Sequence, residues 1–439
     1  MSGDLTRLAE QTIERAGKAG AQQSAALISR RRFIDLQYRD GKLEKITESK
    51  TSSLSLDLYV DGRFSSHSSS DLRPQILKPF VARAVAMTRL LGADKHRGLA
   101  DPALYDNRPT TDIQIYDPAY EQVTTDRRKA IASAIERTAR AQEGPIISVT
   151  SGYYDALGES AQVHSNGFSG YRRATQFWMG GEVSVKDEGG RRPEDWYWVG
   201  GRFLSELPGA KVIGREAANR ALARLGQVKL DSGHMTVVVE NRASRSLMRH
   251  FMKAMSGSSL QQQRSFLTDK LGKRVGSSAF HLVDEPLLPR ALGSRHYDSD
   301  GISAKKRTLV DRGKLTSYLI DVYYGRKLGA APTTNGTSNL VMGLGKRSKE
   351  AIIKSVKKGV FISGFLGGNS DSTVGDFSHG IVGFEIRDGK LGRPIGEMNI
   401  TGNHLSLWTK LVEVGNDPYL YSTMHIPTLV FEALSVSGK

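Results

Sequence analysis

Helical periodicity and strand-like alternation divide the first part of the chain. A helix is predicted over residues 5–18, where apolar residues recur at helical spacing. A second helix is predicted over 74–91, with Asp71 as its N-cap. Between them, alternating segments closed by Asp-Gly turns predict strands over 25–28, 33–38, 43–46 and 54–60. This pattern indicates an N-terminal α+β domain over residues 1–92.

The same order of elements returns further along the chain. Residues 93–120 are polar and hold three prolines, which is typical of a linker. Helices are predicted over 124–141 and 211–225. Strand-like segments lie between these helices, over 146–154, 160–164 and 174–185. The repeated order indicates a central α+β domain over 121–228 and a structural repeat.

The pattern changes near residue 230. A valine-rich strand over 235–240 precedes a helix over 244–255 that has one apolar face. Short strands broken by glycine then dominate, with examples at 316–321, 359–365, 381–387 and 428–434 and one helix at 349–358. The prediction is an α+β fold in two parts. An N-terminal antiparallel sheet-and-helix part is followed, over 229–439, by a large, mostly antiparallel β-rich C-terminal domain, barrel-like or sandwich-like.

Composition narrows the class of protein. The chain has 439 residues, 38% of them hydrophobic and 25% charged, which is typical of a soluble globular protein with several domains. It has no cysteine, so disulfides and thiolate metal ligands are excluded. No signal peptide and no apolar run of about 20 residues is visible. We therefore expect a cytoplasmic protein with no membrane partner.

The net charge of +16 is concentrated in the second half of the chain. Residues 1–220 hold 32 Lys and Arg against 28 Asp and Glu, whereas residues 221–439 hold 30 against 18. Such an excess is compatible with a polyanion-binding surface. The basic residues are scattered, however, and no basic stripe is interleaved with aromatic residues. Nucleic acid is therefore the less favoured partner.

Six segments, each containing a glycine, follow one another along the chain. They are Ser165-Asn166-Gly167-Phe168, Gly214-Arg215-Glu216-Ala217-Ala218, Tyr297-Asp298-Ser299-Asp300-Gly301, Asp311-Arg312-Gly313-Lys314-Leu315, Gly375-Asp376-Phe377-Ser378 and Glu397-Met398-Asn399-Ile400-Thr401-Gly402-Asn403. Each is weak alone, because such turns are common. In this order and spacing they resemble the TldD/PmbA family of bacterial and archaeal metallopeptidases and their partner subunits, over nearly the whole chain.

The resemblance also shows what this chain lacks. Catalytic family members carry the zinc motif His-Glu-x-x-x-His on a helix, and the resemblance implies a cysteine ligand near the end of the chain. A catalytic zinc needs about three side-chain ligands. In this chain the corresponding helix, 244–255, holds only His250, which is followed by Phe251, and Met255 stands five residues on. The resemblance therefore implies a TldE-like or PmbA-like member without catalytic or metal-binding residues, with zinc only in the partner protease.

Polar residues near this helix outline the region where a remnant of the site is expected. The predicted residues are His250, Ser256, Gln261, Gln262 and His379. A substitute metal site built from His250, His379, His404 and His425 stays open as an alternative.

The resemblance implies a function without catalysis in this chain. We expect a non-catalytic subunit that supports proteolysis of unfolded peptides, as a heterodimer with a TldD-like protease subunit or as a homodimer, and that is inactive alone. Two alternatives remain. One is a basic nucleic-acid- or gyrase-associated binding protein, since the family is also labelled as modulators of DNA gyrase. The other is a peptidase with an unrecognised metal site.

Overall fold

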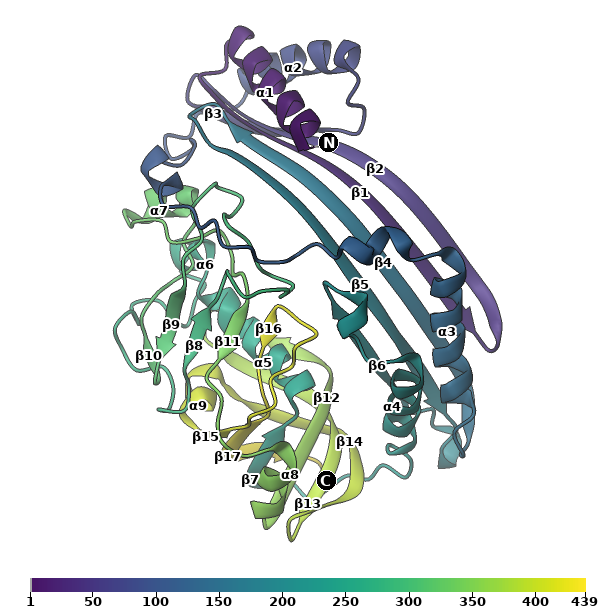
Figure 1. Cartoon of the computed structure of the whole chain (residues 1–439). Helices are drawn as coiled ribbons and strands as arrows, with labels where there is room; N and C mark the ends of the chain where they lie inside the picture. Colours follow the sequence, from purple (N-terminus) through teal and green to yellow (C-terminus); the bar gives the residue numbers. More distant parts are fainter. Residues whose placement is uncertain (1) are drawn as a thin grey trace.

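A long, curved sheet forms the first part of the molecule, and a β-rich body lies within its curve (Figure 1). The computed structural model describes residues 2–439. The sheet has six antiparallel strands in the order β3-β2-β1-β4-β5-β6. These strands are β1 (Gln23–Arg39), β2 (Lys42–Val60), β3 (Arg63–Ser69), β4 (Ile146–His164), β5 (Ser169–Val185) and β6 (Glu194–Gly201).

Four helices cover one face of this sheet. They are α1 (Ser2–Lys18), α2 (Pro74–Thr88), α3 (Thr125–Arg140) and α4 (Ala210–Leu222). The buried side chains of β1 and β4, such as Ala26, Ile28 and Tyr153, point toward the helices. The helix, three-strand, helix order therefore occurs twice, as the sequence pattern predicts. The opposite face of the sheet is turned toward the β-rich body (Figure 1).

A closed barrel forms the centre of the second part. The strands β14-β13-β12-β7-β17 follow one another, and β14 also pairs with β17, which closes the ring. β15 extends it. The strands are β7 (Gly233–Val239), β12 (Lys358–Ser370), β13 (Asp376–Arg387), β14 (Lys390–Asn403), β15 (Leu411–Val414) and β17 (Leu429–Ser437). Only the β7–β12 neighbours run parallel. This confirms the predicted α+β fold with a mostly antiparallel, barrel-like C-terminal part.

Helices and a smaller sheet surround the barrel. The helices are α5 (Asn241–Ala254), α6 (Gly257–Gln261), α7 (Val322–Leu328), α8 (Lys349–Ser355) and α9 (His404–Thr409). The small sheet contains β8 (Leu282–Asp284), β9 (Arg307–Asp311), β10 (Lys314–Leu315), β11 (Leu340–Met342) and β16 (Met424–His425). The apolar face of α5 belongs to the largest core cluster, together with barrel residues such as Val237 and Ile362.

Some strand predictions were wrong in extent. The segments 25–28 and 33–38 are parts of one strand, β1, because main-chain pairing continues through the polar residues between them. The segments 43–46 and 54–60 are likewise both part of β2. Polar side chains do not interrupt these strands, because the pairing is made by main-chain hydrogen bonds. The strand β6 had not been predicted at all.

Two local predictions were also wrong. Asp71 does not cap α2, because its carboxylate accepts from the Arg73 amide and the helix begins at Pro74. Proline suits the first helical position because its φ is fixed near the helical value. The segment 316–321 does not form the predicted strand. Its last residue, Asp321, caps α7 instead, because its side chain accepts from the Tyr324 amide.

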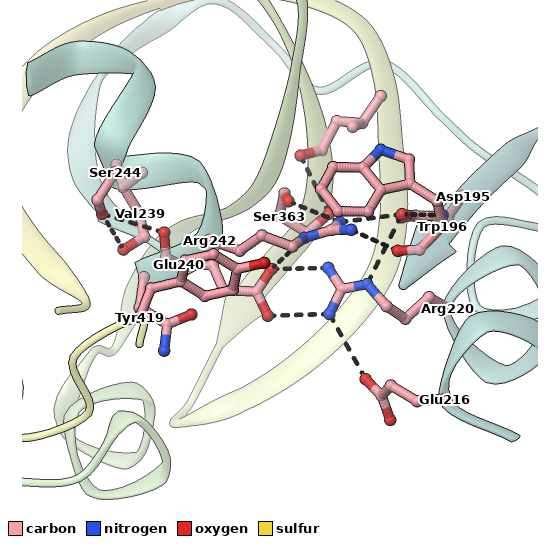
Figure 2. Close-up of polar contacts among 12 residues, drawn as sticks. Asp195, Trp196, Glu216, Arg220, Val239, Glu240, Arg242, Ser244, Ser363 and Tyr419 are labelled. Carbon is pink, nitrogen blue, oxygen red and sulfur yellow. Dashed lines mark hydrogen bonds and ion pairs between the residues drawn. The ribbon is translucent and has the colours of Figure 1, made fainter. Parts of the chain in front are cut away.

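A buried ion network joins the sheet to the barrel (Figure 2). Arg220 of α4 donates to both carboxylate oxygens of Glu240, at 3.0 and 2.7 Å. Arg242, in the first turn of α5, donates to Asp195 of β6 at 2.9 Å and to the Trp196 carbonyl at 2.5 Å. Its guanidinium also lies 4.3 Å from the centre of the Trp196 ring. The network therefore connects α4 and β6 to the start of α5.

Each buried charge in the network faces an opposite charge. The side chains of Asp195, Glu240 and Arg242 are each 7% exposed and that of Arg220 is 14% exposed. Burial acts to lower the pKa of Arg220, but the hydrogen bonds and negative charge of Glu240, with Asp195, outweigh burial and raise that pKa. Losing one member would leave a buried charge unpaired, which typically costs about 3–5 kcal/mol.

We predict that Glu240→Gln lowers the free energy of unfolding by about 3 kcal/mol, because it removes the charge that faces Arg220. Urea denaturation of the purified chain measures this. Glu216→Gln is the matched control, since Glu216 also faces Arg220, at 3.6 Å, but is 42% exposed. An exposed pair contributes about 0–1 kcal/mol. Equal effects of the two substitutions would contradict the role given to the network.

Candidate functional site

The helix α5 is held by its apolar face in the barrel core. It starts directly after β7, and Leu247, Phe251 and Met255 along it are almost fully buried. The Phe251 ring lies 5.1 Å from the Phe280 ring and 5.7 Å from the Trp408 ring. Phe251 and Met255 occupy the positions where the zinc motif, counted from His250, would place its glutamate and second histidine. Core packing therefore takes the place of metal ligands.

Three histidines meet beside α5. The His250 ring lies 5.3 Å from that of His379 on β13 and 5.7 Å from that of His404 at the start of α9. The structure thus brings together two residues predicted for the remnant site, His250 and His379, with His404, which was predicted only in the alternative set of four histidines. The rings of Phe266 and Phe377 stack on this group, Phe266 on His404 and Phe377 on His379. We call His250, His379 and His404 the histidine cluster.

Burial keeps the histidine cluster neutral. Burial lowers the pKa of His250, and Arg249 and Lys253 lower it further. Burial, with a contribution from His250, also lowers the pKa of His379. Burial lowers the pKa of His404 to about 3, and the other two histidines contribute. Near neutral pH the rings can therefore donate and accept hydrogen bonds, but they do not act as cations.

The histidine cluster does not match a metal site. The His250 and His379 rings are stacked, with 26° between their planes. Because imidazole lone pairs lie in the ring plane, stacked rings do not direct them at a common point. His404 Nε2 lies 3.0 Å from the Ser370 hydroxyl. Within residues 2–439, no three His, Cys, Asp or Glu side chains are arranged to hold a metal ion. The family's zinc does not fit these residues.

The other predicted residues lie apart from the histidine cluster. Ser256 caps α6 by accepting from the Ser259 amide. Gln261 and Gln262 lie at the end of α6. His425 lies on β16, with a buried Nε2 that has no hydrogen-bond partner. In the described part of the chain, no hydrogen bond or ring contact joins these four residues to the cluster.

The position of His404 in the sequence gives a signal for its place in the cluster. It follows directly on Asn403, the last residue of a segment that carries the family resemblance. The Asn403 side chain donates to the Asp376 carboxylate at 2.8 Å. The His404 amide donates to the Gly375 carbonyl at 2.8 Å. Two resemblance segments therefore bind each other and fix the position of His404.

A second pair of resemblance segments meets where the sheet contacts the C-terminal part. The Phe168 ring lies 5.0 Å from the Tyr297 ring. Gly301 has φ +82°, and a Cβ atom there would lie 2.8 Å from both Phe168 and Tyr105. Only glycine suits such a backbone in so small a space. These two segments therefore pack against each other and join distant parts of the chain.

Models of the PmbA/TldA metallopeptidase family match the chain in three stretches. The domain 1 model matches residues 25–88, the central domain model matches 118–225 and the C-terminal domain model matches 232–438. Fold and matches together define a metallopeptidase-like protein of mixed α/β structure. The chain belongs to the TldD/PmbA family.

Individual proteins agree with this assignment. The metalloprotease PmbA of Escherichia coli O157:H7 is 27% identical, over 97% of this chain and 94% of its own length. A solved structure from Bacteroides thetaiotaomicron, described as a candidate modulator of DNA gyrase, is 38% identical with a TM-score of 0.96, covering 99% of this chain and 98% of its own. TldE from Thermococcus kodakarensis shares the fold, with 20% identity and a TM-score of 0.87, over 98% of this chain and 100% of its own.

Membrane insertion through a helix has no support in the structure. In the described part of the chain, no helix combines the length and apolar character that crossing a bilayer requires.

We predict that the histidine cluster makes the protein sensitive to acid. A histidine whose pKa is lowered by folding stabilises the protein fully above its unfolded pKa, near 6.5, and loses that contribution as pH falls toward the folded value. Below about pH 6.5, His404 should therefore reduce the free energy of unfolding by up to about 1.4 kcal/mol per pH unit. Urea denaturation from pH 7 to pH 4 measures this slope.

His404→Phe should flatten that slope, because Phe does not titrate and the site is already lined by Phe266 and Phe377. The exposed His234 supplies the control, His234→Asn, which should keep the wild-type slope. A His404→Phe slope equal to that of the wild type would contradict the prediction.

Proposed function

We propose that this chain is the non-catalytic subunit of a TldD-type metalloprotease and supports the proteolysis of unfolded peptides. The observation that carries the proposal is the burial of Phe251 and Met255 in the core, at the positions where a zinc motif would need a glutamate and a histidine. The helix is complete and well packed, so its structure does not depend on a metal. What such a chain contributes is a scaffold, and we expect it to act in the cytoplasm.

The histidine cluster fits a binding role in this scheme. Its rings are neutral, and His379 Nε2 and His404 Nδ1 are buried without a hydrogen-bond partner. His250, the partly exposed member of the cluster, can bond the amide or carbonyl groups of a peptide main chain, which every sequence offers. Recognition of that kind supports a role with unfolded peptides of varied sequence.

We predict that the purified chain cleaves no peptide alone and holds no stoichiometric zinc. The chain offers no thiolate, and its three clustered histidines do not converge. Elemental analysis and a quenched fluorescent peptide assay test this, with a TldD-like subunit from the same organism as the positive control. Near one zinc per chain, together with chelator-sensitive cleavage by this chain alone, would favour a peptidase with an unrecognised metal site.

We also predict a stable association with that TldD-like subunit, or a homodimer when the chain is made alone. An interface that supports such a complex should bury more than about 1,000 Å². Sedimentation velocity of the chain, with and without the subunit, measures the association, and peptide cleavage by the mixture measures its function. A strict monomer that leaves the activity of the added subunit unchanged would refute the proposed function.

A further inference from the structure

A cavity of about 660 Å³ lies between the sheet and the C-terminal part, away from the histidine cluster. Leu27 of β1, Ser160 of β4 and Arg172 of β5 line one side of it. Leu27 points away from the helices, because its neighbours Ala26 and Ile28 are buried beneath α1 and α2. The cavity therefore opens on the face of the sheet that is turned toward the barrel. The segments 112–118 and 295–299 complete its wall.

Arg172 is a cation without a partner in this wall. Its Nε atom is buried and makes no hydrogen bond. In the part of the chain that the structure describes, the side chain has no ion pair, and its charged or titratable neighbours include Tyr297, Arg295 and Arg202. Burial lowers the pKa of Arg172, and Arg295 lowers it further. A guanidinium that loses water contacts without gaining an acceptor is costly, so functional sites are a common reason for one.

Two more arginines strengthen the positive field. Arg202 donates to the main-chain carbonyls of Thr175 and Leu292, and the charge that acts on it is that of Arg172. Arg295, also in the cavity wall, donates to the Asn335 carbonyl at 3.4 Å and to the Thr334 hydroxyl at 3.1 Å. Both arginines donate to neutral groups, although the charge of Arg295 also acts on the carboxylates of Asp298 and Asp284.

The carboxylates in the cavity wall are already engaged. Asp298 accepts from the main-chain amides of Asn335, Ile302 and Asp300, at 2.7, 3.0 and 2.9 Å. Asp112 accepts from the Gln114 amide at 2.8 Å. Both therefore stabilise local turns, and neither forms an ion pair with Arg172. In the described part of the chain, no carboxylate pairs with Arg172, so its charge is available to a ligand.

Part of the wall is apolar. Leu27 is 39% exposed, although it is a large aliphatic residue. Ile113, Ile115 and Phe203 also line the cavity. A guanidinium next to an apolar wall suits a ligand with a carboxylate and a hydrocarbon side chain on adjacent atoms. The last residue of a peptide has both.

We propose that this cavity binds the carboxylate of a peptide, with Arg172 donating to the carboxylate and an apolar side chain packing against Leu27. The choice of a peptide rests on the function proposed above. The carboxylate can belong to the peptide's C-terminus or to an acidic side chain, and the chemistry at Arg172 is the same for both. The site would hold one end of a peptide on the sheet.

The test is direct binding of short fluorescent peptides to the purified chain, followed by anisotropy. The peptides are Ala-Gly-Ala-Leu with a free C-terminus, the same peptide as its C-terminal amide, and an amidated peptide with an internal Glu. The free peptide should bind, and Arg172→Gln should weaken its binding about 30-fold, since an unpaired buried charge typically costs 2 kcal/mol or more. Binding lost on amidation identifies the C-terminus as the source, and binding of the Glu peptide identifies a side chain.

Two controls separate binding from folding. Arg30→Gln removes one positive charge from strand β1 of the same sheet, where Arg30 pairs with Asp4, and should leave peptide binding unchanged. Arg172→Gln should unfold at the same urea concentration as the wild type or a higher one, because the Arg172 side chain makes no hydrogen bond or ion pair within residues 2–439. Arg172→Lys, which keeps the charge but not the planar fork, should bind with intermediate affinity.

Several results would overturn the proposal. They are peptide binding that is unaffected by Arg172→Gln, equal loss with Arg30→Gln, and competition by inorganic phosphate without binding of any of the three peptides. Because the assay uses this chain alone, a failure to associate with a TldD-like subunit would refute the proposed function and leave the result at Arg172 intact.

Discussion

The bidentate pair between Arg220 and Glu240 is the constraint on which the molecule's two parts depend. It joins α4, a helix of the sheet layer, to the residue that precedes α5. Arg242, in the first turn of α5, binds the Asp195 carboxylate and the Trp196 carbonyl. A buried ion pair contributes little net stability compared with a well-packed apolar contact. The two hydrogen bonds of this ion pair require a fixed geometry, however, and here they fix the position at which α5 starts. The position of His250, two and a half turns on, follows from that start.

Arginines have two contrasting environments in this chain. At the junction, Arg220 donates to the Glu240 carboxylate, and Arg242 donates to the Asp195 carboxylate and the Trp196 carbonyl. In the cavity beside β5, Arg172 has none of these. The cost of desolvation is similar in both places, but only the junction offsets it within the chain. Charge compensation therefore distinguishes an arginine that holds the fold together from one that is available to a ligand.

The sequence predicted what local patterns determine. The helices, the Asp40-Gly41 turn and the change of pattern near residue 230 all depend on neighbouring residues, and the structure contains them. The length of β1 and β2 depends on pairing between distant segments, which periodicity does not reveal. His250 and His379 were predicted to lie in one region, and they do. His404 was named with them only in the alternative set of four histidines. Arg172 has no local signal, because its lack of a partner is a property of the folded surroundings.

The resemblance segments and the missing zinc ligands have different physical origins, which explains how one can persist without the other. Phe168 packs on Tyr297, and Asn403 bonds Asp376, so both contacts hold together segments that are far apart in the sequence. Neither contact involves a metal ligand. These contacts do not require a zinc motif on α5, where apolar residues such as Phe251 and Met255 fill the core. The resemblance segments therefore indicate the fold of this chain. Whether the chain has catalytic chemistry depends on the side chains of α5 and the surfaces around it.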